Sequence, residues 1–268
     1  MRKIRFKLSN FNFSKRQIFV ISTLLLTLGL IATQLLPTAF RYPSVLLLGF
    51  FSFLFSAFCL REDLSKHEWL TLLTLPTLFT LGVSYFYFLL PVRWITRLPV
   101  AVFYALGYYG VLLTENIFNV SAGRTIQLIR AAQTVGFYLT LITCFLFLDL
   151  LFSLHLPFFV NFLLAFMALT LLFVQYFWSV RLTDKVERMV WIYAISLAFA
   201  ASQIALAISF WPVRTLTSSL FLSSIFYAFL GIGGYELQDR LFKRVALEFI
   251  TVPVFVFILM FVTTSWTS

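Results

Sequence analysis

Long apolar runs alternate with short polar segments along the whole chain. A helix needs about 20 apolar residues to cross a bilayer, and runs of roughly that length occur nine times. We place the predicted spans at residues 17–36, 43–60, 69–90, 94–114, 132–154, 157–179, 190–211, 213–234 and 245–264. The pattern therefore predicts an all-α fold, a polytopic integral membrane helical bundle with nine spans.

Composition indicates that lipid is the solvent for much of this chain. Hydrophobic residues make up 61% of the 268 residues and charged residues 11%, whereas a soluble domain carries roughly 25% charged residues. A chain of this composition could not hide its apolar surface in water. The net charge of +10 comes from short basic clusters dispersed between the apolar runs, so we expect no nucleic acid partner.

The distribution of basic residues predicts the topology. With nine spans and a cytoplasmic N-terminus, 16 of the 20 Lys and Arg residues fall in inner segments and four in outer segments, as the positive-inside rule requires. The six tryptophans lie at predicted span ends, where the ring favours the membrane interface. We expect an integral plasma (inner) membrane protein with its C-terminus outside, whose basic N-terminal segment contacts anionic inner-leaflet lipids.

Two segments of the chain have similar sequences. The stretch FYALGYYGVLLTENIF at 103–118 returns in altered form as FYAFLGIGGYELQDRLF at 226–242, and the alignment places Glu115 opposite Asp239. We interpret this as a tandem parallel four-helix repeat plus a ninth helix; chance alignment of apolar segments is the alternative. The predicted organisation is a basic cytoplasmic N-terminal segment (1–16), four-span repeat A (17–118), a cytoplasmic linker (119–130), four-span repeat B (131–242), and the ninth span with a short outer C-terminus (243–268).

Small residues form a face on each of the repeated helices. Gly107, Gly110 and Thr114 follow helical spacing in one copy, and Gly231, Gly234 and Gln238 repeat it in the other. Alanines 194, 198, 201 and 205 offer a matching face on the seventh span. Such faces let helices approach closely in lipid. We expect them to pack tightly where the two repeats meet; the alternative is a moving seam between two half-bundles.

The first candidate site lies at the outer ends of the spans. It comprises Arg93, Arg97, Asp149, His155 and Arg214. Asp149 is the only carboxylate well inside a predicted span, so it should find a partner, and Arg97 or Arg214 is the expected one. The functional interpretation is an outer vestibule that binds a phosphate or carboxylate group. The alternative is arginines that reach lipid headgroups and a structural ion pair at Asp149.

The second candidate site lies at the predicted inner face. Glu115, Arg124 and Asp239 are the residues that we expect to form a cytoplasmic gate or a docking site for a partner. The segment 114–134 combines these polar groups with apolar residues that suit a short interfacial helix. The alternative is an ordinary surface linker between two spans.

The chain carries none of the common catalytic or cofactor-binding motifs, such as a P-loop, HExxH, CxxC or GxSxG. Its two histidines and two cysteines have no metal-ligand spacing. We therefore expect no catalytic residue, no metal and no cofactor.

Three functions remain open from the sequence. The first is a transporter- or permease-like protein that handles an anionic lipid or a small anionic or amphipathic molecule. The second is a non-catalytic accessory or scaffold subunit of a membrane complex, with a membrane protein partner or a second copy. The third is a membrane-embedded enzyme acting on a lipid-linked substrate. A polar cavity at Asp149 would favour the first or third, and a second carboxylate, histidine or serine beside it would favour the third.

Overall fold

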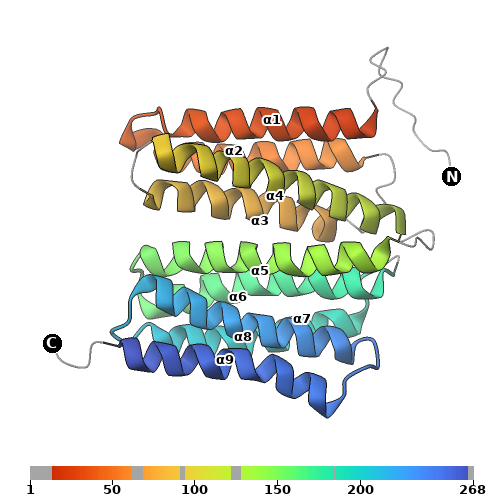
Figure 1. Ribbon diagram of the computed structural model, residues 1–268, viewed down its shortest axis with the longest axis vertical. Coiled ribbons are helices and arrows are strands. Elements are labelled where there is room, and N and C mark those ends of the chain that lie inside the picture. Colours follow the sequence, from red (N-terminus) through yellow and green to blue (C-terminus); the bar gives the residue numbers. More distant parts are fainter. Residues whose placement is uncertain (1–13, 62–68, 91–93, 122–127, 184, 265–268) are drawn as a thin grey trace.

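Nine long helices lie side by side in the computed structural model, which describes residues 14–61, 69–90, 94–121, 128–183 and 185–264 (Figure 1). Each helix is long and apolar enough to cross a membrane. The prediction of a helical membrane bundle is therefore confirmed, and the protein is an integral membrane protein. The helices are α1 (Lys15–Thr33), α2 (Thr38–Leu60), α3 (Trp69–Leu89), α4 (Trp94–Ser121), α5 (Ile129–Ser153), α6 (Phe158–Arg181), α7 (Arg188–Ile208), α8 (Thr215–Glu236) and α9 (Lys243–Thr263).

The largest difference from the predicted spans is the end of α4. The predicted span stops at residue 114, but the helix continues to Ser121 and carries Glu115 and Asn119 inside the bundle. These polar side chains fit there because they bond to neighbouring helices: Gln175 donates to Glu115, and Asn119 donates to the carbonyl of Leu60. The expectation that Asp149 is the only carboxylate well inside a span is therefore wrong.

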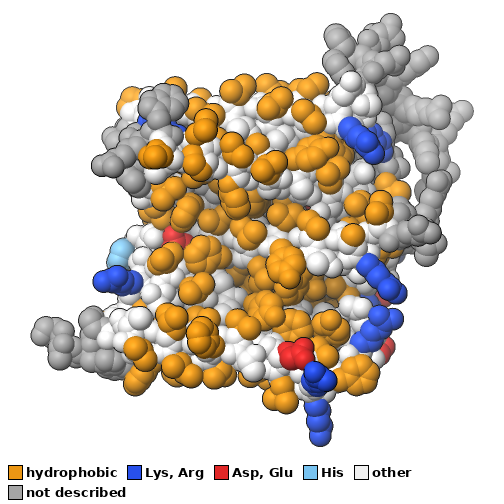
Figure 2. Space-filling model, in the orientation of Figure 1, with side chains coloured by type: hydrophobic (Ala, Val, Ile, Leu, Met, Phe, Trp, Pro, Cys, Tyr) orange, Lys and Arg blue, Asp and Glu red, His pale blue; other side chains and the backbone are white. Residues whose placement is uncertain are grey.

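The described chain begins at one end of the bundle and finishes at the other (Figure 1). We call the end where α1 and α9 begin the N-side and the end where α9 finishes the C-side. Charged side chains gather towards these two ends, and hydrophobic side chains cover the surface between them (Figure 2). This distribution is the one expected of a bundle whose middle faces hydrocarbon and whose ends face water.

Helices α1–α4 and helices α5–α8 form two units with the same set of neighbours. In the first unit, α1 packs against α2 and α4, α2 against α3 and α4, and α3 against α4. Each of these five contacts has its counterpart four helices later. The helix that follows each unit also packs in the same way, since α5 contacts α4 as α9 contacts α8. This is the arrangement that two copies of one unit plus an extra helix would give.

The two units meet where α3 and α4 pack against α5 and α6. We call this interface the seam. Two glycines allow a close approach there: a Cβ at Gly82 would lie 3.2 Å from that of Leu146, and a Cβ at Gly136 would lie 3.3 Å from atoms of both Thr114 and Phe118. Small residues at these points let the helices pack in lipid, where no hydrophobic effect drives them together.

Two features that we expected at interfaces lie inside the second unit instead. The alanine face of α7 is fully buried, but the neighbours of α7 are α6 and α8 rather than the first unit. Trp178 is at the end of α6 as predicted, yet it is 0% exposed and its indole N–H donates to the carbonyl of Thr183 at 2.9 Å. The alanines therefore pack helices within one unit, and Trp178 belongs to the core rather than to an interfacial belt.

Candidate functional site

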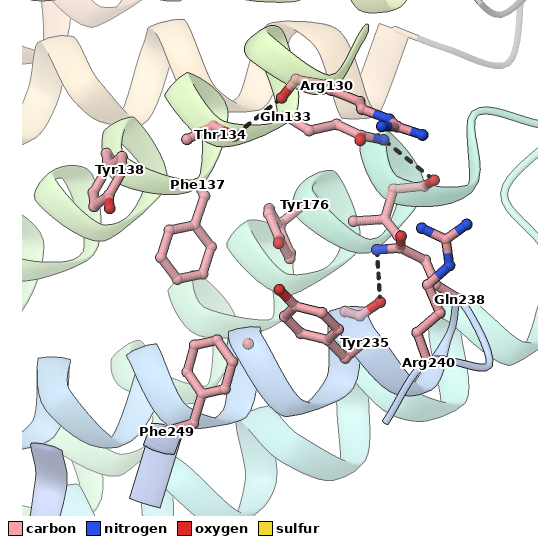
Figure 3. A pocket seen from close by; sticks show the side chains of 13 residues that line it. Arg130, Gln133, Thr134, Phe137, Tyr138, Tyr176, Tyr235, Gln238, Arg240 and Phe249 are labelled. Atoms are coloured by element: carbon pink, nitrogen blue, oxygen red, sulfur yellow. Dashed lines mark hydrogen bonds between the residues drawn. The ribbon is translucent and has the colours of Figure 1, made fainter. Parts of the chain in front are cut away.

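A cleft of about 410 Å³ opens near the N-side of the second unit, between α5, α6, α8 and α9 (Figure 3). Its residues come from segments that are far apart in the sequence. The lining residues are Arg130, Gln133, Thr134, Phe137, Tyr138, Tyr176, Val180, Gly231, Gly234, Tyr235, Gln238, Arg240 and Phe249. The volume falls within the range of roughly 300–1,000 Å³ that is usual for small-molecule sites.

Two arginines stand at the mouth of the cleft. Arg130 lies in the first turn of α5 and Arg240 lies just beyond α8, and both point to the same end of the cleft (Figure 3). Both side chains are exposed. Among the described residues, the ion pairs join Arg181 to Glu187 and Arg244 to Glu248, so neither mouth arginine has a carboxylate within 4.0 Å. The mouth therefore carries two positive charges that the described protein does not neutralise.

The turn after α8 sets the position of Arg240. The backbone N–H of Arg240 donates to the carbonyl of Tyr235 at 3.0 Å, and Asp239 between them has a φ of 56°. This left-handed residue and the bond across five residues are the pattern of a Schellman helix end. Arg181 holds the same turn by donating to the carbonyl of Leu237 at 3.0 Å. The turn is thus bound to α6, and it directs Arg240 back towards the cleft.

Two glutamines also line the polar part of the cleft. Gln133 of α5 donates its amide to the carbonyls of Ser179 and Val180, at 3.1 and 3.4 Å, near the end of α6. Gln238 donates to the carbonyl of Gly234 at 3.1 Å. Because the last carbonyls of a helix have no partner within the helix, these bonds satisfy them and hold both glutamines in place. The polar part of the cleft is therefore ordered without a ligand.

Aromatic rings form the walls farther into the bundle. The ring centroid of Phe137 lies 5.7 Å from that of Tyr176, and the ring of Tyr235 lies 5.8 Å from that of Phe249. Gly231 and Gly234 lie between these rings, and a Cβ at Gly234 would come within 3.1 Å of Tyr176. The missing side chains let the rings of Phe249 and Tyr176 pack directly against the backbone of α8. The cleft is thus polar and basic at its mouth and aromatic inside.

Asp149 forms no ion pair with Arg97 or Arg214, the two described arginines that were its expected partners. Its carboxylate is 4% exposed and accepts a hydrogen bond from the hydroxyl of Ser219 on α8 at 3.1 Å. The same hydroxyl lies 3.0 Å from the carbonyl of Thr215 in its own helix. The physical reason is that α5 and α8 are neighbours inside the second unit, so the side chain faces α8 and not the arginines at the C-side surface.

The other residues of the predicted outer vestibule are spread over the C-side. Arg97 lies in the first turns of α4, Arg214 is the exposed residue before α8, and Arg93 lies outside the described residues. His155 follows α5 with a φ of 48°, and its Nδ1 lies 2.9 Å from the carbonyl of Ser153. No described hydrogen bond or ion pair joins Asp149 to His155 or Arg214. A shared ligand site for these residues stays a prediction.

The predicted inner residues lie in three different environments. Glu115 is 0% exposed inside α4, Asp239 is exposed in the turn after α8, and Arg124 lies outside the described residues. Their role as a gate or docking site stays a prediction. The sequence did not point to Gln133, Tyr176 or Arg240 as site residues. The available signal was the face of Gly231, Gly234 and Gln238, which lies in the cleft, but the helices opposite that face could not be identified from spacing.

Comparison with known proteins places the chain without assigning an activity. No curated protein matches it, and no solved structure matches it. A family model matches residues 53–263, from the second half of α2 to the last residue of α9. The match includes every helix that lines the cleft and all of the seam. The chain therefore belongs to the family described as "Protein of unknown function (DUF5656)".

Proposed function

We propose that this protein binds an anionic amphiphile, such as an anionic lipid, in the cleft between α5, α6, α8 and α9. The observation that carries the proposal is the pair of mouth arginines, Arg130 and Arg240, which have no carboxylate partner among the described residues and stand over an aromatic wall. A guanidinium binds phosphate or carboxylate oxygens through paired N–H donors. An acyl or other apolar chain would lie against Phe137, Tyr235 and Phe249.

The expected topology supports this ligand class. Basic residues dominate the described N-side, including Arg61, Arg130 and Arg188, whereas the described C-side carries Arg41, Arg97 and Arg214. By the positive-inside rule we infer that the N-side is cytoplasmic in a plasma (inner) membrane. The cytoplasmic leaflet is the one in which anionic lipids create a negative surface potential. The cleft would open at the headgroups of that leaflet.

The wider role that we propose is transporter- or permease-like handling of the bound molecule. The support is architectural: two four-helix units of the same arrangement meet at one seam, and the cleft lies in the second unit beside that seam. Parallel repeats of this kind occur in transporters whose halves move against each other. The cleft would then be the point at which the ligand enters or leaves.

The binding proposal can be tested with purified protein and two lipids of identical acyl chains. We would measure lipid adducts by native mass spectrometry after adding phosphatidylglycerol or phosphatidylcholine to the detergent-solubilised protein. Wild type should retain phosphatidylglycerol in preference to phosphatidylcholine. The double variant Arg130→Ala/Arg240→Ala should lose that preference, with a fall of at least about tenfold in apparent affinity, because two charge-assisted contacts are removed.

Arg214→Ala is the matched control, since Arg214 is also exposed but lies at the other end of the bundle. It should bind phosphatidylglycerol as wild type does. Equal retention of both lipids by wild type, or an unchanged preference in the double variant, would contradict the cleft as an anion site. Loss of binding only in Arg214→Ala would move the site to the predicted outer vestibule.

The second candidate, an accessory subunit, is favoured by the exposure of α9. Only 11% of the membrane-crossing window of α9 is buried, and its buried side chains are Val256 and Met260. A helix this open could lie against a membrane protein partner as well as against lipid. Extraction in native lipid patches followed by mass spectrometry would test this role: a second polypeptide in stoichiometric amount would support it, and lipid alone would not.

The enzyme alternative gains little from the structure. Ser219 does lie beside Asp149, but no described histidine or second carboxylate bonds to either group. The cleft is also remote from them. Arg130 and Asp149 lie on the same helix, 19 residues apart in sequence, and at about 1.5 Å per residue this corresponds to roughly 28 Å. No specific observation therefore supports a reaction at Asp149.

A further inference from the structure

A second site is suggested by Glu115, which lies on α4 at the seam between the two units. Its carboxyl group has no exposed surface. One oxygen accepts a hydrogen bond from the amide of Gln175 on α6 at 2.7 Å, while the other, Oε2, has no hydrogen-bond partner among the described residues. Gln175 is oriented in turn by the hydroxyl of Thr140 on α5, 3.4 Å from its side-chain oxygen. The protein thus fixes one carboxyl oxygen and leaves the other available.

Asn119 supplies a second free oxygen one helical turn later on the same face of α4. Its amide nitrogen donates to the carbonyl of Leu60 at 3.0 Å, which fixes the orientation of the side chain. Its oxygen Oδ1 is buried and, like Oε2 of Glu115, has no hydrogen-bond partner in the described part of the chain. Two adjacent buried acceptors without a donor are unusual, because burying an unpaired polar group costs about 1–3 kcal/mol.

The described charged groups around Glu115 do not compensate it. The helices packed against α4 are α1, α2, α3 and α5, and α6 reaches it through Gln175. At this end they carry Lys15, Arg16, Cys59, Arg61, Arg130, Tyr176 and Arg181 as charged or titratable groups. None of the described cations lies within 4.0 Å of the Glu115 carboxyl group. A bare carboxylate in such a place is costly unless it is paired.

We propose that Glu115 and Asn119 form a binding site for one monovalent positive charge, a proton or a small cation such as sodium, at the seam. Either species would neutralise the carboxyl group. A proton would let Oε2 donate to a neighbouring acceptor, and a cation would be coordinated by Oε2 and Oδ1 together. The proposal is independent of lipid binding in the cleft.

The location gives the site its consequence. Of the side-chain hydrogen bonds recorded between described residues, the one from Gln175 to Glu115 joins the two units across the seam. Asn119, one turn along α4, bonds to the carbonyl of Leu60 on α2, and Thr140 of α5 bonds to Gln175. Occupation of the site therefore changes the charge at the polar contact that links the first unit to the second. A ligand that binds one arrangement of the seam more tightly would shift the units towards it.

Infrared difference spectroscopy identifies a bound proton. We would compare the C=O stretching region of wild type and Glu115→Gln, both purified in detergent. A protonated-carboxyl band that is present in wild type and missing in Glu115→Gln supports the proton as ligand. The same band should remain in Asp149→Asn, which removes the other buried carboxyl group among the described residues, so that any contribution from Asp149 is separated.

Thermal unfolding distinguishes the cation. Wild type in sodium chloride and in choline chloride of equal ionic strength should differ by several degrees in midpoint if sodium binds, and Glu115→Gln should lose this difference. If Glu115→Gln fails to fold, Asn119→Ala keeps the carboxyl group, removes one of the two oxygens and should reduce the sodium effect. No protonated-carboxyl band together with no sodium dependence would overturn the proposal and leave a carboxylate satisfied by water.

Discussion

The ends of α4 and α8 are equivalent in the repeated phrase but differ in the structure. Helix α4 continues to Ser121 and keeps Glu115 inside the bundle, whereas α8 stops at Glu236 and Asp239 lies in an exposed turn. The helix that follows each end differs as well. Gly136 lets α5 approach α4, but Phe249 of α9 rests against Gly231 of α8 and lines the cleft.

This contrast shows how one arrangement of helices yields two kinds of interface. A glycine on the following helix gives a closed seam with a buried polar contact. An aromatic residue near the same level gives a cleft with a basic mouth. Because the contacts between helices match in the two units, the difference comes from single side chains at the contact surfaces and from where α4 and α8 end.

The largest expected effect comes from opening the seam. Gly136→Leu places a side chain where a Cβ already comes within 3.3 Å of Thr114 and Phe118. Overpacking of this kind costs about 1–3 kcal/mol, so we expect a clear fall in the thermal unfolding midpoint in detergent. Gly110→Ala is the control, because its Cβ would be 3.9 Å from Leu139, an ordinary contact. Equal midpoints for the two variants would mean that the seam is not closely packed.

The second prediction separates the aligned acidic residues. Glu115→Ala leaves the amide of Gln175 buried without its acceptor, which should lower the free energy of unfolding by about 1–3 kcal/mol. Asp239→Gly removes the equivalent carboxyl group in an exposed turn whose positive φ suits glycine. It should change the free energy of unfolding by less than about 0.5 kcal/mol. Denaturant titration in mixed micelles measures the free energy of unfolding of both variants. Similar decreases in the two variants would mean that Glu115 and Asp239 lie in equivalent environments after all.

The smallest effect on stability is expected from filling the cleft. Thr134 lines the mouth and is exposed, so Thr134→Trp should alter the free energy of unfolding by less than about 0.5 kcal/mol. The bulky ring would occupy the space proposed for the ligand, and retention of phosphatidylglycerol should fall about tenfold or more. Native mass spectrometry reports binding, and the unfolding midpoint confirms that the fold is intact. Full retention in a folded variant would place the lipid elsewhere.

The number and order of the helices were predictable because the length of an apolar run is a local property of the sequence. The end of α4 was not. Hydropathy falls at Thr114, so the sequence predicts that Glu115 lies in a loop. Only the structure shows that its partner, Gln175, lies beside it. That partner is 60 residues away in sequence, so no local pattern indicates that the carboxyl group is buried.

The cleft was predictable only in part. The small-residue face of Gly231 and Gly234 indicated a close approach, and Arg130 lies within the segment 114–134 that we placed at the inner face. Tyr176, Phe249 and Arg240 come from three other segments, and their meeting depends on how α6 and α9 pack around α8. The partner of Asp149 was missed for the same reason, since Ser219 looks like an ordinary polar residue on the face of a helix.

Helix α9 contributes to two features of the second unit through one packing contact. It packs against α8 as α5 packs against α4, although little of its own surface is buried. Through Phe249 it also forms one wall of the cleft. Displacement of α9 would therefore uncover α8 and remove a wall of the cleft at the same time.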